Sequence, residues 1–143
     1  MILFDTNILV YVHNVESPNH QIAYQLESQV IKEKLEAAVS SQNLTELYAT
    51  ITNPSKISKP VVPAEAKRII NDYLNSSFQI IYPKEDDLKL ALSLVSDKKV
   101  VGRKIFDVYL VATMLSNSIN TIYTNNDKDF QIFDNIKVVN PFK

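Results

Sequence analysis

Short apolar runs alternate along the chain with longer segments in which apolar residues recur every three or four positions. The short runs are rich in branched and aromatic side chains and predict buried strands at Met1–Phe4, Ala37–Ser41, Phe78–Tyr82, Thr121–Thr124 and Ile136–Val139. The longer segments between them predict helices. Strands that alternate with helices are typical of a parallel sheet covered on both faces. The pattern therefore predicts an α/β fold, a three-layer α/β/α sandwich with a central parallel β-sheet, and leaves the strand order open.

The helical segments carry start signals and apolar stripes. Ser17 and Pro18 predict one helix start, since Ser is a favoured N-cap and Pro suits the first turn. Pro63 predicts another start. The helix after Pro83 has a predicted core-facing stripe that consists of Leu88, Ala91, Leu92 and Val95. The segment Asp107–Leu115 is apolar on nearly all sides, which predicts a central, buried helix.

The composition fits one ordinary domain over residues 1–143. With 45% hydrophobic and 22% charged residues the chain is globular, and it is long enough to bury a core without disulfides. Its formal net charge of −1 gives no overall attraction to nucleic acid, so RNA binding must rest on a local basic patch. The chain has no Cys and two His, which excludes thiolate chemistry and argues against a multi-histidine metal site. The single glycine, Gly102, excludes the glycine-rich loops that bind nucleotide phosphates.

The first residues lack the basic region of a secretion signal, and Asp5 interrupts their apolar run. The apolar stretches are far shorter than the ~20 residues that a membrane span requires. We therefore expect a cytoplasmic protein.

Four acidic residues lie at predicted strand ends or helix starts, far apart in the sequence: Asp5, Glu46, Asp107 and Asp127. Each also has a purely structural explanation. Asp5 would cap a helix, and Glu46 would form a capping box with Asn43. Asp107 would be a first-turn acid favoured by the helix dipole, and Asp127 a turn residue. Together they would gather at the carboxyl edge of the sheet, where α/β proteins bind ligands. Carboxylates brought together repel one another, and a hard divalent metal that prefers oxygen ligands would relieve this repulsion. The arrangement indicates phosphodiester chemistry.

Four sequence blocks contain these acids, and they cover Ile2–Asn7, Asn43–Tyr48, Gly102–Thr113 and Thr124–Phe130. In this order the blocks resemble the motifs of PIN-domain nucleases, and the resemblance extends over the whole chain. No single block is specific, but four in succession are. Small single-domain members of this family most resemble VapC-type toxins, which are ribonucleases paired with an antitoxin.

The resemblance implies a metal-dependent endoribonuclease that hydrolyses RNA and leaves 5′-phosphate and 3′-hydroxyl ends. The implied catalytic acids hold one or two Mg²⁺ or Mn²⁺ ions, which activate a water molecule, and they are Asp5, Glu46, Asp107 and Asp127. Asp127 lies three residues after Thr124, a loose fit to the family pattern, so Asp129 is a second acid or a substitute. The implied partners are an RNA substrate, a cognate antitoxin protein and, because related toxins are typically dimers, a second copy of the chain.

Other polar and basic residues flank the acids. Thr6, Asn7 and Thr124 are candidate supporting groups, although each also suits a turn at a strand end. The basic residues before Asp107 are expected to hold RNA phosphates, although charge runs are usually solvated loops; they are Lys98, Lys99, Arg103 and Lys104. His13 and His20 are expected to be ordinary surface or helix residues.

Two other interpretations stay open. A haloacid-dehalogenase-like phosphatase would use Asp5 as a nucleophile at a strand end, but that chemistry requires a second acid two residues later, where the chain has Asn7. A catalytically silent PIN-like module that binds RNA or protein would not need all four acids. Release of phosphate from small phosphomonoesters would support the first interpretation, and metal-independent RNA binding without cleavage the second.

Overall fold

A computed structural model of the chain describes residues 1–95 and 99–143, which contain five strands and seven helices. The strands are β1 Ile2–Phe4, β2 Ala37–Ser40, β3 Gln79–Ile81, β4 Thr121–Tyr123 and β5 Lys137–Val139. The helices are α1 Thr6–Val12, α2 His20–Ile31, α3 Ser41–Ile51, α4 Pro63–Leu74, α5 Asp87–Leu94, α6 Lys104–Ser116 and α7 Asp127–Phe130. The five predicted strands are confirmed, each within one residue of its predicted ends. Helix α7 was not predicted, because one turn is too short to show a periodic apolar pattern.

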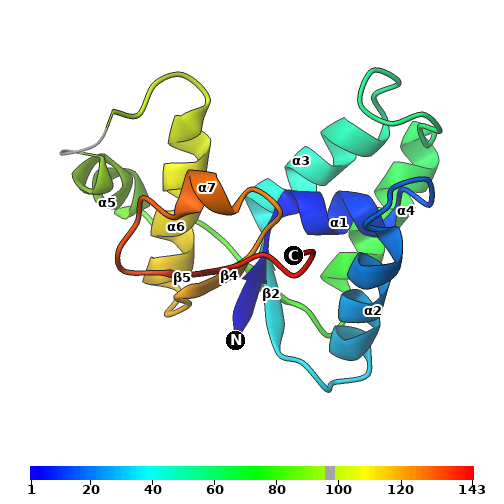
Figure 1. Cartoon of the computed structure of the whole chain (residues 1–143), viewed down its shortest axis with the longest axis horizontal. Helices are drawn as coiled ribbons and strands as arrows, with labels where there is room; N and C mark the ends of the chain where they lie inside the picture. The colour runs from blue at the N-terminus through cyan, green and yellow to red at the C-terminus, as the bar shows by residue number, and fades with distance from the viewer. Residues whose placement is uncertain (96–98) are drawn as a thin grey trace.

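The strands form one parallel sheet in the order β3-β2-β1-β4-β5. Figure 1 labels β2, β4 and β5 of this sheet. The chain starts in the middle of the sheet, moves outwards through β2 to β3, and returns to β4 on the other side of β1. Such a reversal leaves a crevice at the carboxyl ends of the two central strands, where open α/β sheets bind ligands. Asp5 follows β1 and Thr124 follows β4, so both residues lie at this crevice.

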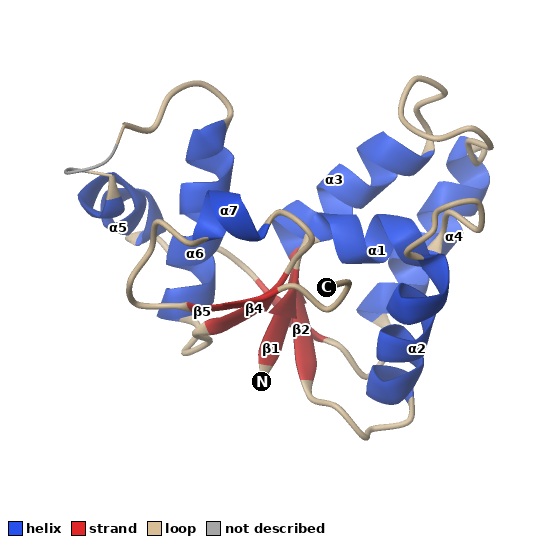
Figure 2. Ribbon diagram, in the orientation of Figure 1, coloured by secondary structure: helices blue, strands red, loops and turns tan. Residues whose placement is uncertain are grey.

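Helices cover both faces of the sheet (Figure 2). Successive residues of a strand point to opposite faces. Phe4 and Val39 therefore belong to the core under α1, α2, α3 and α4, whereas Leu3 and Ala38 belong to the core under α5 and α6. All four side chains are fully buried. This arrangement confirms the predicted three-layer α/β/α sandwich with a central parallel sheet.

Hydrogen-bonding side chains at the strand ends set the helix starts. Asp5 caps α1, and Ser40 caps α3 in a capping box with Asn43. The alternative explanation of Glu46, as the partner of Asn43 in a capping box, is therefore wrong, and the Glu46 carboxylate makes other contacts. Helix α2 begins later than Ser17 predicts, because the Ser17 hydroxyl accepts a backbone N–H in the turn before the helix.

Helices α5 and α6 differ in how well their buried faces were predicted. Helix α6 is central as expected, and its Val111 and Met114 are fully buried. On α5 the predicted stripe is partly wrong, because Leu88 and Leu92 are exposed while Leu90 and Leu94 pack against the core. Leucine lies on several sides of this helix, so its pattern did not define one face. Among the described residues no helix is both long and apolar enough to cross a membrane, and the cytoplasmic location stays a prediction.

Candidate active site

Asp5 lies in the crevice between β1 and β4 and is held by three neighbours. Its Oδ1 accepts the Thr6 N–H at 2.8 Å, and its Oδ2 accepts Asn7 Nδ2 at 3.0 Å and Thr124 Oγ1 at 2.7 Å. The residue is 8% exposed, and this burial raises the pKa of Asp5 to about 6. The hydrogen bonds lower the pKa and the charge of Glu46 raises it. The three polar residues expected to support the site thus all contact Asp5.

Glu46 reaches the same crevice from α3. Its Oε2 accepts the Thr6 hydroxyl at 3.3 Å, and Thr6 Oγ1 in turn accepts Asn43 Nδ2 at 3.0 Å. Its Oε1 accepts Gln42 Nε2 at 2.7 Å, and the same amide nitrogen donates to the Phe106 carbonyl at 3.1 Å. Gln42 therefore links α3 to the first turn of α6. Our sequence interpretation missed Gln42, although its spacing of four from Glu46 places both residues on one face of the helix.

Asp107, in the first turn of α6, is the electrostatic centre of the site. Its pKa is raised to about 7, first by burial and then by the charges of three other carboxylates, which belong to Asp5, Asp129 and Glu46. The charge of Lys104 opposes this shift but has the smallest influence. Among the described residues no hydrogen-bond donor reaches the Asp107 carboxylate. Asp107 is therefore half-buried among like charges that Lys104 offsets only in part, an arrangement that favours a bound cation.

The two acids that follow β4 have different surroundings. Asp127 accepts Asn140 Nδ2 at 3.0 Å and Lys143 Nζ at 2.9 Å, and these contacts lower its pKa. Asp129, by contrast, is one of the charges that raise the pKa of Asp107, and Asp127 is not. Residues two apart in a helix do not share a face. The geometry therefore brings Asp129 to the other acids and turns Asp127 away from them, the reverse of the order preferred from the sequence.

Basic residues border the acids on two sides. Arg103 and Lys104 line a groove of about 620 Å³ beside the acids. Lys99 and Lys104 line a smaller cavity of about 120 Å³, together with Lys128. Lys128 was not predicted, although it directly precedes an acid of the fourth sequence block. Lys98, the remaining residue of the predicted basic patch, lies outside the described residues.

The acids offer only oxygen donors, which suits a hard divalent cation such as Mg²⁺ or Mn²⁺. In the described part of the chain, however, no three His, Asp or Glu residues lie close enough to hold one metal ion as the side chains stand. Asp5 is fixed by Thr124 and Asn7, and Asp127 is fixed by Asn140. The structure thus brings carboxylates into electrostatic range without the fully converged ligand set that the sequence predicted.

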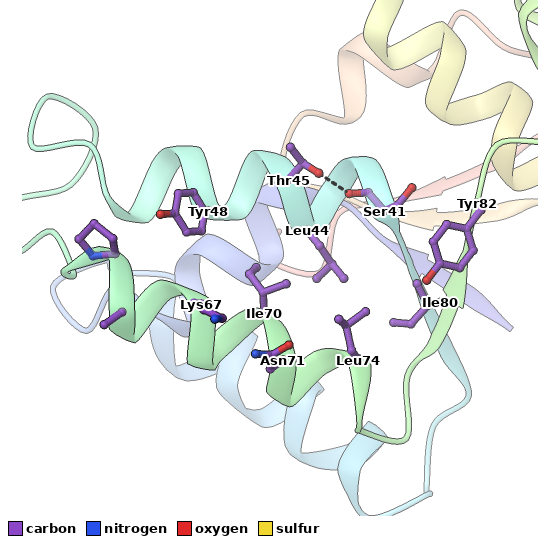
Figure 3. Close-up of a pocket in the computed structure, with 12 residues that line it drawn as sticks. Ser41, Leu44, Thr45, Tyr48, Lys67, Ile70, Asn71, Leu74, Ile80 and Tyr82 are labelled. Atoms are coloured by element: carbon purple, nitrogen blue, oxygen red, sulfur yellow. Dashed lines mark hydrogen bonds between the residues drawn. The ribbon is translucent and has the colours of Figure 1, made fainter.

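An apolar groove lies beside the acidic one, between α3 and α4 (Figure 3). It has a volume of about 720 Å³, and the apolar side chains that line it include Leu44, Ile70, Leu74 and Ile80. Ser41 and Thr45 line both grooves, so the two hollows adjoin on α3. Large exposed apolar hollows of this kind mark binding surfaces.

Comparison with known proteins agrees with this arrangement. Ribonuclease VapC24 of Mycobacterium tuberculosis is 24% identical over 141 residues, which cover 99% of this chain and 97% of that protein. The fold matches the VapBC2 structure from Rickettsia felis, bound to a promoter DNA fragment, with a TM-score of 0.68, 23% identity and 98% of both chains covered. It also matches M. tuberculosis VapC20, a toxin that cleaves the sarcin–ricin loop, with a TM-score of 0.70, 16% identity, and 96% and 99% of the two chains covered. The family model of the PIN domain matches residues 2–136, and the chain therefore belongs to the PIN-domain family.

Proposed function

We propose that the protein is a divalent-metal-dependent endoribonuclease and the toxin of a type II toxin–antitoxin pair. The observation that carries this proposal is Asp107, a half-buried carboxylate among like charges with no hydrogen-bond donor in the described structure. A cation bound beside such a group would favour its ionised form near neutral pH. Membership of the PIN family and similarity to a ribonuclease support RNA as the substrate.

Four carboxylates would hold Mg²⁺ or Mn²⁺, and they belong to Asp5, Glu46, Asp107 and Asp129. We assign Asp129 in place of Asp127 because its charge acts on Asp107, whereas Asp127 is occupied by Asn140 and Lys143. When bound, the metal activates water for attack on the scissile phosphate and neutralises charge on the leaving oxygen.

The chain's own residues then orient the acids and the substrate. Thr124 fixes one oxygen of Asp5, and Gln42 fixes one oxygen of Glu46, so that both acids keep their direction as substrate binds. Arg103 and Lys104 supply positive charge along the groove, where they would hold the negatively charged RNA backbone.

The test is cleavage of single-stranded RNA with Mg²⁺ or Mn²⁺ and with excess chelator. We expect cleavage only with metal, and products that carry 5′-phosphate and 3′-hydroxyl ends. Full activity in chelator contradicts the metal mechanism. Phosphate release from small phosphomonoesters would indicate a phosphatase, and RNA binding without any cleavage a silent module.

The antitoxin partner is part of the proposal, and the apolar groove of Figure 3 is its proposed docking surface. An apolar antitoxin segment seated there would lie next to the acidic groove, because Ser41 and Thr45 border both hollows. Such a pair would act in the cytoplasm. We expect Leu74→Asp to abolish inhibition by the co-expressed antitoxin, whereas Leu88→Asp, at an exposed position of α5, leaves inhibition intact. Equal inhibition of both variants contradicts this assignment.

A homodimer is also proposed. One chain of this size and of net charge −1 offers a short basic surface for a long RNA, and pairing two basic loops would lengthen it. Light scattering at tens of micromolar should give twice the 16.3 kDa chain mass. A strictly monomeric mass contradicts the dimer without affecting the nuclease proposal.

A further inference from the structure

Two hollows meet at Asp107. The acidic groove of about 620 Å³ lies on one side and has Arg103 and Phe106 in its lining. The cavity of about 120 Å³ lies on the other side and has Lys99 and Lys128 in its lining. Asp107 contributes to both linings, so a strand that crosses this acid would enter one hollow from the other. The groove lining includes the exposed ring of Phe106, whereas the cavity lining combines the ammonium groups of Lys99 and Lys128 with the carboxylates of Asp107 and Asp129.

Phe106 has no part in either hydrophobic core. The inward side of α6 is provided by buried residues such as Val108 and Val111, whereas Phe106 is 49% exposed in the groove. The guanidinium carbon of Arg103 lies 5.5 Å from the centre of the Phe106 ring. This distance is within the range of a cation–π contact. An exposed ring with a planar cation beside it, next to the Asp107 carboxylate, is suited to stack against another flat group.

We propose that Phe106 and Arg103 form a stacking platform for one unpaired nucleobase beside the scissile phosphate, and that Lys99 and Lys128 hold the neighbouring phosphate across Asp107. This inference rests on the proposed nuclease function and deepens it by assigning a base subsite and a phosphate subsite. Aromatic rings and Arg guanidinium planes bind the faces of unstacked bases. The groove volume lies within the range of small-ligand sites, which allows it to admit one nucleoside.

The subsites determine which RNA the protein accepts. A base that lies on Phe106 must have left its own helix, so the platform selects unpaired loops or single strands over duplexes. Every base has a flat face, so the platform by itself tolerates many sequences. The lysines read no base and contribute a salt-dependent attraction.

The chain contains no tryptophan, so a single introduced one is a clean reporter. Phe106→Trp places it on the platform, and Tyr82→Trp, at an exposed ring in the apolar groove, is the matched control. Both are titrated in excess chelator, where no cleavage is proposed, with a single-stranded RNA decamer and with its duplex. We expect the single strand to quench Phe106→Trp fluorescence and the duplex to quench it much less, with no quenching of the control. Equal quenching of both variants, or none of Phe106→Trp, overturns the platform.

Because this measurement needs no catalysis, quenching without any RNA cleavage would reject the nuclease proposal and keep the base subsite. Kinetics complete the test. Phe106→Ala should raise KM for single-stranded RNA by roughly 5- to 150-fold with little change in kcat, and Phe106→Tyr should restore it. Lys128→Met should reduce the slope of log affinity for RNA against log salt concentration by about 1, as expected for the loss of one phosphate contact. An unchanged KM for Phe106→Ala, or an unchanged salt dependence for Lys128→Met, contradicts the corresponding subsite.

Discussion

Two groups of titratable residues in this protein differ in the neighbours that surround them. One is the carboxylate cluster at the carboxyl edge of the sheet, centred on Asp107. The other lies between α1, α2 and α4, where His13 Nε2 lies 3.0 Å from Tyr73 Oη and the Tyr73 hydroxyl donates to Glu27. Burial lowers the pKa of His13 to about 4 and raises the pKa of Glu27. His13 is a partly buried residue at the C-terminal end of α1.

The two groups differ in whether hydrogen-bond partners stabilise their polar atoms. In the group of His13, Tyr73 and Glu27, each polar atom in the chain of contacts has a partner, and the His13 and Tyr73 rings pack edge to face with centroids 5.8 Å apart. Asp107 has like charges around it and no donor among the described residues. A perturbed pKa alone does not separate structure from function. A half-buried carboxylate among like charges, with no hydrogen-bond donor and with Lys104 as a minor opposing charge, is the better candidate for a cation site.

The largest expected effect separates these two groups by activity. Asp107→Asn should lower RNA cleavage by more than the roughly 10- to 100-fold typical of outer-shell partners of a metal, because it removes a proposed ligand. Glu27→Gln keeps an oxygen that can accept from Tyr73 and should leave cleavage unchanged. Initial rates at saturating Mg²⁺ provide the measurement. Comparable losses of activity in the two variants would show that the surroundings of Asp107 and Glu27 do not separate a functional carboxylate from a structural one.

The second prediction divides the two acids of α7. Asp129→Asn should lose cleavage nearly as far as Asp107→Asn. Asp127→Asn should lose far less, because an amide oxygen still accepts from Asn140 while only the ion pair with Lys143 is weakened. Cleavage rates across a Mg²⁺ titration measure this difference. A greater loss for Asp127→Asn would restore Asp127 as the fourth acid.

A smaller effect is expected at Gln42, which orients Glu46. Gln42→Ala removes the bond to Glu46 and the bond to the Phe106 carbonyl, and should cost roughly 10-fold in activity or metal affinity. Gln42→Glu, of similar shape, places a like charge beside Glu46 and should cost more near neutral pH than below the ordinary carboxylate pKa. If the ratio of the activities of Gln42→Glu and Gln42→Ala did not change with pH, this orienting role would be contradicted.

The smallest effect concerns how stability changes with pH, to which the two groups should contribute with opposite signs. Asp5 and Asp107 have folded-state pKa values of about 6 and about 7 against 3.8 for the free side chain. The folded state therefore binds more protons from about pH 4 to 7, and the free energy of unfolding falls as pH rises through this window. His13 has a folded-state pKa of about 4 against 6.5, so the unfolded state binds more protons and this group adds stability as pH rises from about 4 to 6.5.

Thermal melts in chelator test these signs with Asp107→Asn. At pH 4 Asp107 is largely protonated, so variant and wild type should melt alike, whereas at pH 7.5 the variant should melt a few degrees higher because one repelling charge is gone. Mg²⁺ should raise the melting temperature of the wild type by binding the folded state, and raise that of the variant less. An equal Mg²⁺ shift in both proteins would show that Asp107 is not part of the metal site.

The sequence by itself determined the local elements and pointed to three acids that the fold brings near one crevice. Strand runs and helical spacing are local properties, so all five strands and the central burial of α6 follow from them. Asp5, Glu46 and Asp107 lie in sequence blocks that resemble the PIN family, and the parallel sheet gathers them near one crevice as expected.

The tertiary structure alone decided the strand order, the acid that α7 presents and the groups that orient the acids. Asp127 and Asp129 are equivalent by composition, and only the contacts of Asn140 and Lys143 turn the first away. Gln42 acquires its role because α6 brings a backbone carbonyl to it from 64 residues away. These choices depend on hydrogen bonds and repulsions between segments distant in sequence, and local propensity and periodicity do not contain that information.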